Sequence, residues 1–353
     1  MIATRSKYFI LVAIPLAAIA QEQKPPDPIQ WQAGPVNIRP TGFLDWIGEW
    51  RSAPTSDSVW THFARIPLTD GPDEYLGSPG HSRAMVKGTM NEGGWSAAGY
   101  YEFDFIDPNR KDPYRLRQVW GEVEHDGWRV LGGKAWSLLR PNRHGMASDT
   151  GMMNTDVIEP AYHVGLVGNR RQQLRLTKQR DHWGTAFAFE RRSESTGGDF
   201  LWKVMHENHA VHLEAIALAG GAARRAFSIA GVVPITSKVR FVTQEFIAHN
   251  AAAEALTLVP VRASGGSFIQ GIEANVTKRI EVYSYGGLVY GSRSNGNRIC
   301  REWTIGASRK TPAPGNYGSF VTGFQYSQMD REPWRGGRGA MNYMQVQFRY
   351  NLW

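Results

Sequence analysis

The chain of 353 residues has a single cysteine, Cys300, and this scarcity excludes several classes of protein. No intramolecular disulfide can form, and a zinc or iron–sulfur site built on several cysteines is ruled out. Charged residues make up only 20% of the chain and aromatic residues 12%, a composition that does not fit a disordered protein. We therefore expect a folded body without covalent cross-links.

Long hydrophobic runs are also missing beyond the N-terminus. The longest apolar stretch of the remaining chain, around residues 215–223, is closed by Arg224 and Arg225. It is too short to cross a bilayer as a helix. A bundle of transmembrane helices is thereby excluded.

The N-terminus has the three-part plan of a secretory signal peptide. Arg5 and Lys7 precede an apolar run over residues 8–20 that ends in small residues. A membrane anchor is the alternative, but it needs about 18 or more apolar residues and would tolerate Pro15 poorly. We expect residues 1–20 to be removed on export, followed by a short Pro-rich periplasmic leader over 21–37 and a folded domain over 38–353.

What the sequence does have is alternation of apolar and polar residues with a period of two. In residues 38–51 one face carries Leu44, Trp46 and other apolar or small residues, and the other face carries charged residues. This pattern predicts a β-strand with one apolar and one polar face. The same alternation recurs in residues 82–90, 95–105, 302–308 and 343–352.

The apolar faces are rich in aromatic and small residues, as in barrels whose outer surface meets lipid. Trp95, Trp128 and Trp183 each lie at a short turn, where an indole ring would sit at a lipid–water boundary. A core tryptophan beside a turn is the alternative for any one of them. Thirteen tryptophans with this recurring placement favour the aromatic girdle.

The connections support the same architecture. Short turns at 91–94 and 125–127 alternate with long polar segments at 52–81 and 140–162. About 21 residues for each strand and its connection suits a barrel of about 16 strands. The sequence therefore predicts an all-β fold, a transmembrane antiparallel β-barrel of about 16 strands, with ambiguous registers between residues 164 and 262.

Several segments resemble bacterial outer-membrane porins of the DcaP-like kind. They are the first strand from Arg39 to Asp45 (RPTGFLD), residues 131–139 (LGGKAWSLL), residues 323–327 (GFQYS) with Arg331 and Trp334 beyond them, and the closing Phe348-Arg349-Tyr350. The resemblance implies a 16-stranded barrel, a homotrimer, and diffusion of small solutes that are often anionic, such as dicarboxylates. Lys134 stands where these porins commonly have glutamine.

The polar faces supply candidates for the lining and selectivity of a pore, and segment 140–162 is the candidate for a loop that folds inward as a constriction. Guanidinium groups pair bidentately with carboxylates, which would favour anionic solutes. The alternative is that these arginines only form ion pairs that stiffen the wall. The candidates are Arg39, Asp45, Glu49, Arg83, Lys87, Glu102, Asp104, Arg115, Arg117, Lys134, Arg140 and Arg143.

Signals of catalysis or metal binding are weak. His206, His209 and His212 are close in sequence, but residues three apart on a strand face opposite sides, so only His206 and His212 could share a face. No nucleophile elbow or phosphate-binding glycine loop is present. We predict no enzyme, no cofactor, no metal and no nucleic-acid partner, and we assign no role to Cys300.

The sequence as a whole predicts an outer-membrane porin through which small hydrophilic, anionic solutes diffuse. Its partners would be these solutes, outer-membrane lipid and two further copies of the chain. Two alternatives stay open. One is a plugged structural or adhesive barrel whose external loops bind a partner, and the other is a barrel hydrolase.

Overall fold

The computed structural model describes residues 29–352 except 56–58, 60–61, 106–113, 150–154, 159–162, 193–196, 210, 252–263 and 294–295. The predicted signal peptide, residues 1–20, and the first part of the predicted leader lie outside the described residues. Within the described residues, no helix is long and apolar enough to cross a membrane.

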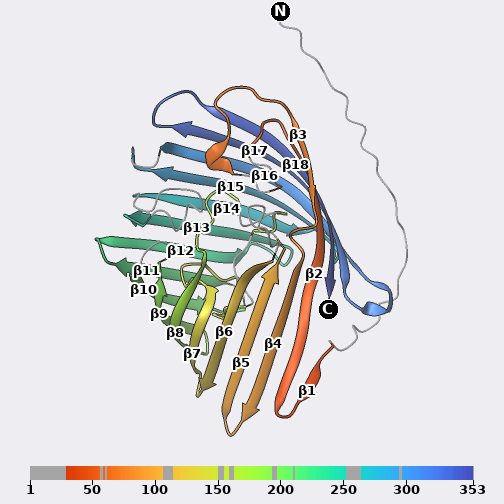
Figure 1. The fold of residues 1–353 in the computed structure, drawn as a ribbon, viewed down its shortest axis with the longest axis vertical. Helices are drawn as coiled ribbons and strands as arrows, with labels where there is room; N and C mark the ends of the chain where they lie inside the picture. Colours follow the sequence, from red (N-terminus) through yellow and green to blue (C-terminus); the bar gives the residue numbers. More distant parts are fainter. Residues whose placement is uncertain are drawn as a thin grey trace, which may run out of the picture.

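Sixteen antiparallel strands form one closed sheet, in which each long strand pairs with its neighbours in sequence and β18 returns to pair with β2 (Figure 1). This confirms the predicted barrel. Two further short strands, β1 (Trp31–Ala33) and β3 (Glu74–Ser78), pair with β2. The barrel strands are β2 (Val36–Arg51), β4 (Arg83–Glu92), β5 (Trp95–Asp104), β6 (Arg115–His125), β7 (Trp128–Trp136), β8 (Arg170–Arg180), β9 (Trp183–Arg191), β10 (Gly198–Glu207), β11 (His212–Gly220), β12 (Arg224–Pro234), β13 (Val239–His249), β14 (Gly265–Asn275), β15 (Ile280–Gly291), β16 (Asn297–Pro312), β17 (Ser319–Pro333) and β18 (Gly339–Leu352).

The connections differ between the two ends of the barrel. At one end, here called the short-turn end, all connections are turns of two to six residues, such as Asp126-Gly127, where both residues have positive φ. At the other, the long-loop end, lie the segments 52–82 and 137–169. The first includes the 3-10 helix η1 (Phe63–Arg65), while η5 (Pro314–Asn316) lies in a turn at the short-turn end.

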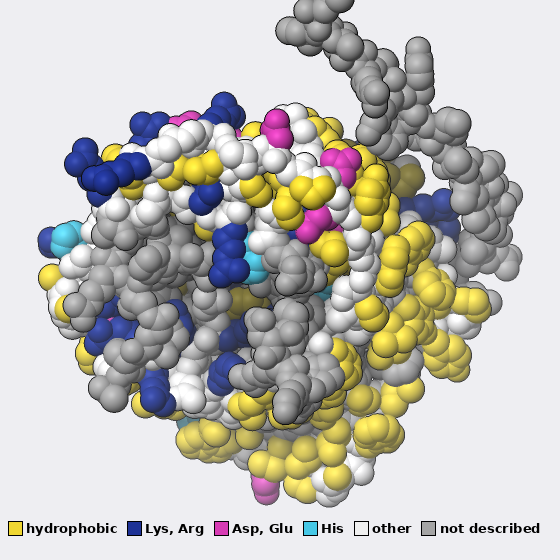
Figure 2. All heavy atoms as spheres, turned by 45° about the horizontal axis from the view of Figure 1, so that its top comes forward, with side chains coloured by type: hydrophobic (Ala, Val, Ile, Leu, Met, Phe, Trp, Pro, Cys, Tyr) yellow, Lys and Arg dark blue, Asp and Glu magenta, His cyan; other side chains and the backbone are white. Residues whose placement is uncertain are grey.

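The alternation predicted for the strands is present, because apolar side chains point outward and polar ones point inward. On β2, Leu44 and Trp46 are 62% and 43% exposed, whereas Asp45 between them is 3% exposed. Trp95, Trp128 and Trp183 are all exposed beside short turns, as an aromatic girdle requires. Hydrophobic side chains cover the flank at the right and bottom of Figure 2, while Lys and Arg side chains gather at the rim at upper left.

The interior departs from a uniformly polar lumen in one part of the barrel. The inward faces of β9, β10 and β11 carry apolar residues, among them Ala186, Leu201 and Ile216, all 3% exposed or less. They form one cluster with Leu139 and Met146 of the segment 137–169, which we call the lumen segment. The apolar lining is explained by this packing, because side chains covered by protein need no contact with water.

Candidate pore lining and constriction

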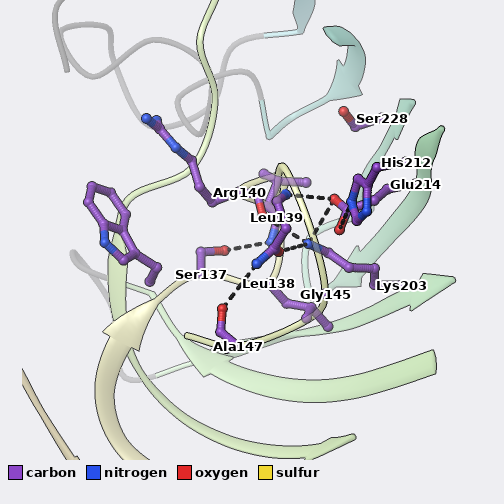
Figure 3. A network of polar contacts seen from close by, with 12 residues as sticks. Ser137, Leu138, Leu139, Arg140, Gly145, Ala147, Lys203, His212, Glu214 and Ser228 are labelled. Carbon is purple, nitrogen blue, oxygen red and sulfur yellow. Dashed lines mark hydrogen bonds and ion pairs between the residues drawn. The ribbon is translucent and has the colours of Figure 1, made fainter. Parts of the chain in front are cut away.

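The lumen segment is fixed to the barrel wall by a buried lysine on β10. Lys203 Nζ donates to the Arg140 carbonyl oxygen at 2.9 Å, to Asn142 Oδ1 at 3.0 Å and to Glu214 Oε2 on β11 at 3.0 Å (Figure 3). The same Glu214 oxygen accepts the Asn142 N–H at 3.0 Å. All three N–H donors of the ammonium group are therefore used, and two of the three acceptors belong to the lumen segment.

A histidine extends this anchor toward the short-turn end. His212 Nδ1 lies 2.7 Å from Glu207 Oε2, and His212 Nε2 lies 3.3 Å from Glu214 Oε1. Glu207 in turn accepts the N–H of Gly145. His212 thus links the carboxylates of two strands, and both of these carboxylates hold backbone groups of the lumen segment.

Two arginines hold a second anchor on β13 and β14. Arg143 of the lumen segment donates to Glu273 Oε2 at 2.9 Å and lies 3.6 Å from Asp156 Oδ2, while Arg240 lies 3.3 Å from the same Asp156 oxygen. Arg240 also pairs with Glu273 and Glu281. Burial raises the pKa of Asp156 to about 7; Arg143 opposes the rise, and Glu273 and Glu281 add to it.

The carboxylates of Asp156, Glu273 and Glu281 form, among the described residues, the one cluster with the residue types of a metal site. Their oxygens lie within 4.8 Å of one another. Arg143 and Arg240 already place two guanidinium groups among these oxygens. Two of the three formal negative charges are thus compensated by protein groups, and the cluster acts as an anchor for the lumen segment.

The C-terminal half of the lumen segment binds to β14, β16 and β17 through its backbone. Glu302 Oε2 on β16 accepts the Val164 N–H at 2.9 Å, and Gln325 Oε1 on β17 accepts the Ile158 N–H at 2.9 Å. The Ser267 hydroxyl on β14 donates to the Gly165 carbonyl oxygen at 2.8 Å. The described residues of the segment therefore contact the wall from β10 to β17.

The lumen segment also reaches the opposite wall, made by β2, β4, β5, β6 and β18. Asp149 Oδ2 of the segment forms an ion pair with Lys87 Nζ on β4, at 2.6 Å. On that wall three arginines pair with carboxylates: Arg349 with Asp45 at 2.8 Å, Arg83 with Glu102 at 3.5 Å, and Arg115 with Asp104 at 2.7 Å. We call Arg83, Arg115 and Arg349 the arginine wall.

A β-bulge adds a fourth guanidinium group behind this wall. The pairing of β5 with β6 shifts between Glu102 and Phe103, so that Glu102 pairs with Gln118 while Asp104 pairs with Arg115. Both Arg117 and Gln118 consequently point inward. Arg117 pairs with Glu102 and lies 2.6 Å from Asp104, and its side chain is almost fully buried.

Phe43 is not among the predicted lining residues, although it lies against two members of the arginine wall, Arg83 and Arg349. Its ring lies 5.0 Å from Arg83 Cζ and 4.2 Å from Arg349 Cζ. Both distances are within the range of a cation–π interaction. The available signal was the position of Phe43 on β2, which by alternation belongs to the polar face with Asp45.

Three predicted lining residues occupy other places. Lys134 is paired with Val119 and Gln172, so it shares the outward face with the exposed Val119. The reason is that alternation along β7 puts Leu131 and Ala135 inside. Assignment of Lys134 to the lumen was therefore wrong.

Arg140 is 3% exposed and does not present its guanidinium group to an open lumen. It donates to the Val167 carbonyl oxygen at 3.2 Å and its Cζ lies 5.1 Å from the Trp136 ring. Burial lowers the pKa of Arg140 to about 9, and Arg117 adds to this effect. Arg143 belongs to the second anchor.

The two remaining candidates, Arg39 and Glu49, both lie on β2. Arg39 is exposed, directly across from Lys87 in the pairing of β2 with β4. Glu49 is buried and accepts hydrogen bonds from Arg51 and Gln345. Neither Glu49 nor Arg51 is accessible, so this pair lies within the wall and does not meet a solute.

The two histidines that alternation would allow to share a face, His206 and His212, lie on opposite faces. His206 pairs with the exposed Trp183 and Leu213, whereas His212 is buried inside. A hairpin turn between β10 and β11 pairs Glu207 with His212, and this reverses the parity on which the expectation rested.

Comparison of the structure with solved structures identifies the architecture. The outer membrane channel DcaP of Acinetobacter baumannii superposes with a TM-score of 0.72 and 11% sequence identity over 92% of this chain and 99% of that chain. The fold is that of a bacterial porin. The trimer form of OmpT, an outer membrane protein of Vibrio cholerae, gives a TM-score of 0.58 at 11% identity over 90% of this chain and 99% of that chain. A Rh. blastica porin variant gives 0.52 at 12% identity, over 89% and 100%. No family model and no curated protein matches the sequence.

The porin fold of this chain thus has a lumen divided by its own polypeptide. One side is filled by the lumen segment and its apolar contacts, and the other side is bordered by the arginine wall. Such a geometry can sort solutes by size and by sign of charge at the narrowest part.

Substitution of Lys203 by methionine tests the first anchor. The variant K203M leaves the buried Glu214 without its cation, and removal of one partner of a buried pair costs about 3–5 kcal/mol. The free energy of unfolding, from urea titrations of protein inserted in vesicles, should fall by that amount. The double variant K203M/E214Q should recover most of it, since the charge left behind is then removed as well. Equal stability of K203M and the unchanged protein would contradict this role of Lys203.

Proposed function

We propose that the protein is an outer-membrane porin that passes small hydrophilic solutes and prefers anions carrying carboxylate groups. The fold, shared with channels of known structure, supports a pore. Insertion in the outer membrane accords with the outward apolar side chains and the tryptophans beside the short turns. A homotrimer is part of the proposal, because the Vibrio cholerae relative in fold is described as a trimer.

The preference for anions rests on which member of each ion pair faces the lumen. The side chains of Arg83, Arg115 and Arg349 are 26%, 26% and 27% exposed, whereas their carboxylate partners are 3%, 1% and 0% exposed. Lys87 and Asp149 repeat this relation at 37% and 6%. A solute in the lumen therefore meets cationic groups first, although formal charges on the wall are largely paired.

The geometry of guanidinium groups gives this preference its chemical class. A guanidinium group has several donors, and pairing with one carboxylate leaves N–H groups available for a second. The Phe43 ring holds two of these groups close together without competing for their hydrogens. Carboxylate-bearing solutes fit such a surface better than neutral solutes of the same size.

Conductance of the refolded protein in a planar bilayer under a potassium chloride gradient tests the proposal. We expect stepwise conductance in groups of three and a reversal potential on the anion-selective side. Addition of a small dicarboxylate should reduce the chloride current, because both compete for the arginine wall. A cation-selective reversal potential would overturn the assignment of the arginines to the selective region.

A plugged structural barrel is the second candidate, favoured by the packing of the lumen segment against the wall from β10 to β17. The same bilayer experiment separates the two. Protein that is shown to be folded and inserted but carries no current would support the plugged barrel and reject the porin.

The anion preference should depend on pH through Asp156. Its pKa, raised to about 7, means that the carboxyl group is mostly charged at pH 8 and mostly protonated at pH 6. Acidification then removes a negative charge from the lumen segment, so anion selectivity should increase as pH falls through 7. The variant D156N should show the higher selectivity at both pH values. A pH response that persists unchanged in D156N would assign the effect to another group.

A further inference from the structure

Outside the lumen, a groove of 610 Å³ runs across the outward surface of β14 to β18. Two neighbouring rows of paired residues form it. One row contains Leu288, Arg301, Asp330 and Ala340, and the next contains Gly286, Trp303, Gln328 and Asn342. Since paired residues share a face of a sheet, and Trp303 is 45% exposed, this groove lies on the outer surface of the barrel.

The groove changes character along the barrel axis. The row nearer the short-turn end has Trp303 as a wall and Gly286 as a floor without a side chain, while Phe268 and Leu288 continue the row of Arg301 as an apolar wall on β14 and β15. The upper part of the groove, toward the long-loop end, has Arg301 and Arg338. An apolar slot below a cationic rim matches an amphiphile with acyl chains and an anionic head.

The cationic rim is constructed like the arginine wall. Arg301 Nη1 lies 2.7 Å from Asp330 and 2.8 Å from Glu332, and Arg338 lies 3.0 Å from Asp330. The side chains of Arg301 and Arg338 are 39% and 61% exposed, against 12% for Asp330. The carboxylates thus orient the guanidinium groups and lie behind them.

The charge around this rim is strongly unbalanced. Residues 292–301 and 330–338 contain six arginines but only two carboxylates, so the formal excess is four positive charges. Arg293, Arg298 and Arg335 are exposed in addition to Arg338. Long loops are found at the external end of outer-membrane barrels, so this rim would lie at the level of the outer-leaflet head groups. An anionic partner is favoured there, and a second copy of this rim would be repelled.

We propose that this groove binds a phosphate-bearing lipid of the outer leaflet, with the phosphate at Arg301 and Arg338 and an acyl chain along Gly286 and Trp303. The site is distinct from the lumen, so its function does not depend on conduction. Arginine is suited to the head group because phosphate oxygens accept its paired N–H donors. The acyl chain replaces bilayer lipid that would otherwise lie in the same slot, and the head group therefore supplies most of the selectivity.

Native mass spectrometry of the full-length protein in detergent, mixed with defined lipids, tests this proposal. The lipids are a diphosphorylated multi-acyl glycolipid and the same glycolipid without phosphate. We expect the phosphorylated lipid to be retained at least about tenfold more tightly, and the variant R301Q/R338Q to lose that advantage. R225Q, which removes an exposed arginine at the same end of β12, is the matched control and should bind like the unchanged protein.

A second variant keeps every charge in place. An added Cβ at Gly286 meets no atom within 4 Å, so G286L should fold and fill the floor of the groove. It should weaken lipid retention, whereas G99L should not, although Gly99 is equally open and also lies on the outward surface, on β5. Equal retention by G286L and G99L would overturn the assignment of the acyl chain to this slot.

Two other outcomes would also overturn the proposal. Inorganic phosphate that binds as tightly as the glycolipid would indicate a site for the free anion. A fluorophore on Q328C that is shielded from brominated acyl chains by a neighbouring subunit would indicate that a second copy covers the groove.

Discussion

Replacement of Arg83, Arg115 and Arg349 together by glutamine is expected to turn the pore from anion-selective to cation-selective. The substitution removes three partly exposed cationic groups and leaves Asp45, Glu102 and Asp104 in the wall. Surface potentials of several kT arise from such charge sets, so the permeability ratio of chloride to potassium should change by at least about tenfold. The reversal potential in a planar bilayer under a salt gradient measures the change.

The matched control for this triple variant is K134Q. Lys134 lies on the outward face of β7, so removal of its charge should leave the reversal potential unchanged. A shift in K134Q as large as one third of that in the triple variant would mean that net charge, and not the arginine wall, sets the selectivity. Single variants at each of the three arginines provide a fallback if the triple variant does not fold, and each should shift the potential in the same direction.

The barrel could be predicted from the sequence because its cause is local. On β2, Leu44 and Trp46 face the apolar surroundings of the barrel, and Asp45 between them faces the interior. This period of two is visible in the sequence without any knowledge of the rest of the chain. The arginine wall was partly predictable for the same reason, since Arg83 and Arg115 fall on polar faces.

Features that depend on three-dimensional contacts could not be predicted in this way. Arg117 was predicted to line the pore, but the inward orientation of Gln118 beside it results from a bulge, which alternation alone does not reveal. Phe43 was missed because an aromatic residue next to arginines appears as an isolated exception in a polar face. Lys134 was placed wrongly because the resemblance of its segment to porins was given more weight than the alternation along β7, which puts Lys134 on the outward face.

The apolar inward faces of β9 to β11 explain why registers there were ambiguous. Ala186, Leu201 and Ile216 face the lumen segment, and the residues beside them in sequence face outward, so both faces of these strands are apolar. Alternation disappears when both sides of a strand meet apolar surroundings. The weak pattern was therefore itself a sign that a part of the chain lies inside the barrel.

Replacement of residues 141–167 by a short glycine–serine linker is expected to have the second large effect. The lumen segment occupies the side of the barrel from β10 to β17, and its removal would leave a wider opening. Conductance of a single channel should rise several-fold, and anion selectivity should fall because ions could then pass far from the arginine wall.

This deletion should also lower the stability of the barrel. The loss of stability distinguishes a lumen segment that packs against the wall from one that only obstructs the pore. Removal of Met146 and its neighbours exposes the inward apolar residues Leu201, Met205 and Ile216 to water, which removes stabilising burial of about 25 cal/mol per Å². The deletion variant should therefore unfold at lower urea concentration, and the substitution of Leu201 and Ile216 by threonine should cost less in this variant than in the full chain. A deletion variant with unchanged conductance would show that the lumen segment does not limit the pore, and the constriction would then have to lie elsewhere on the wall.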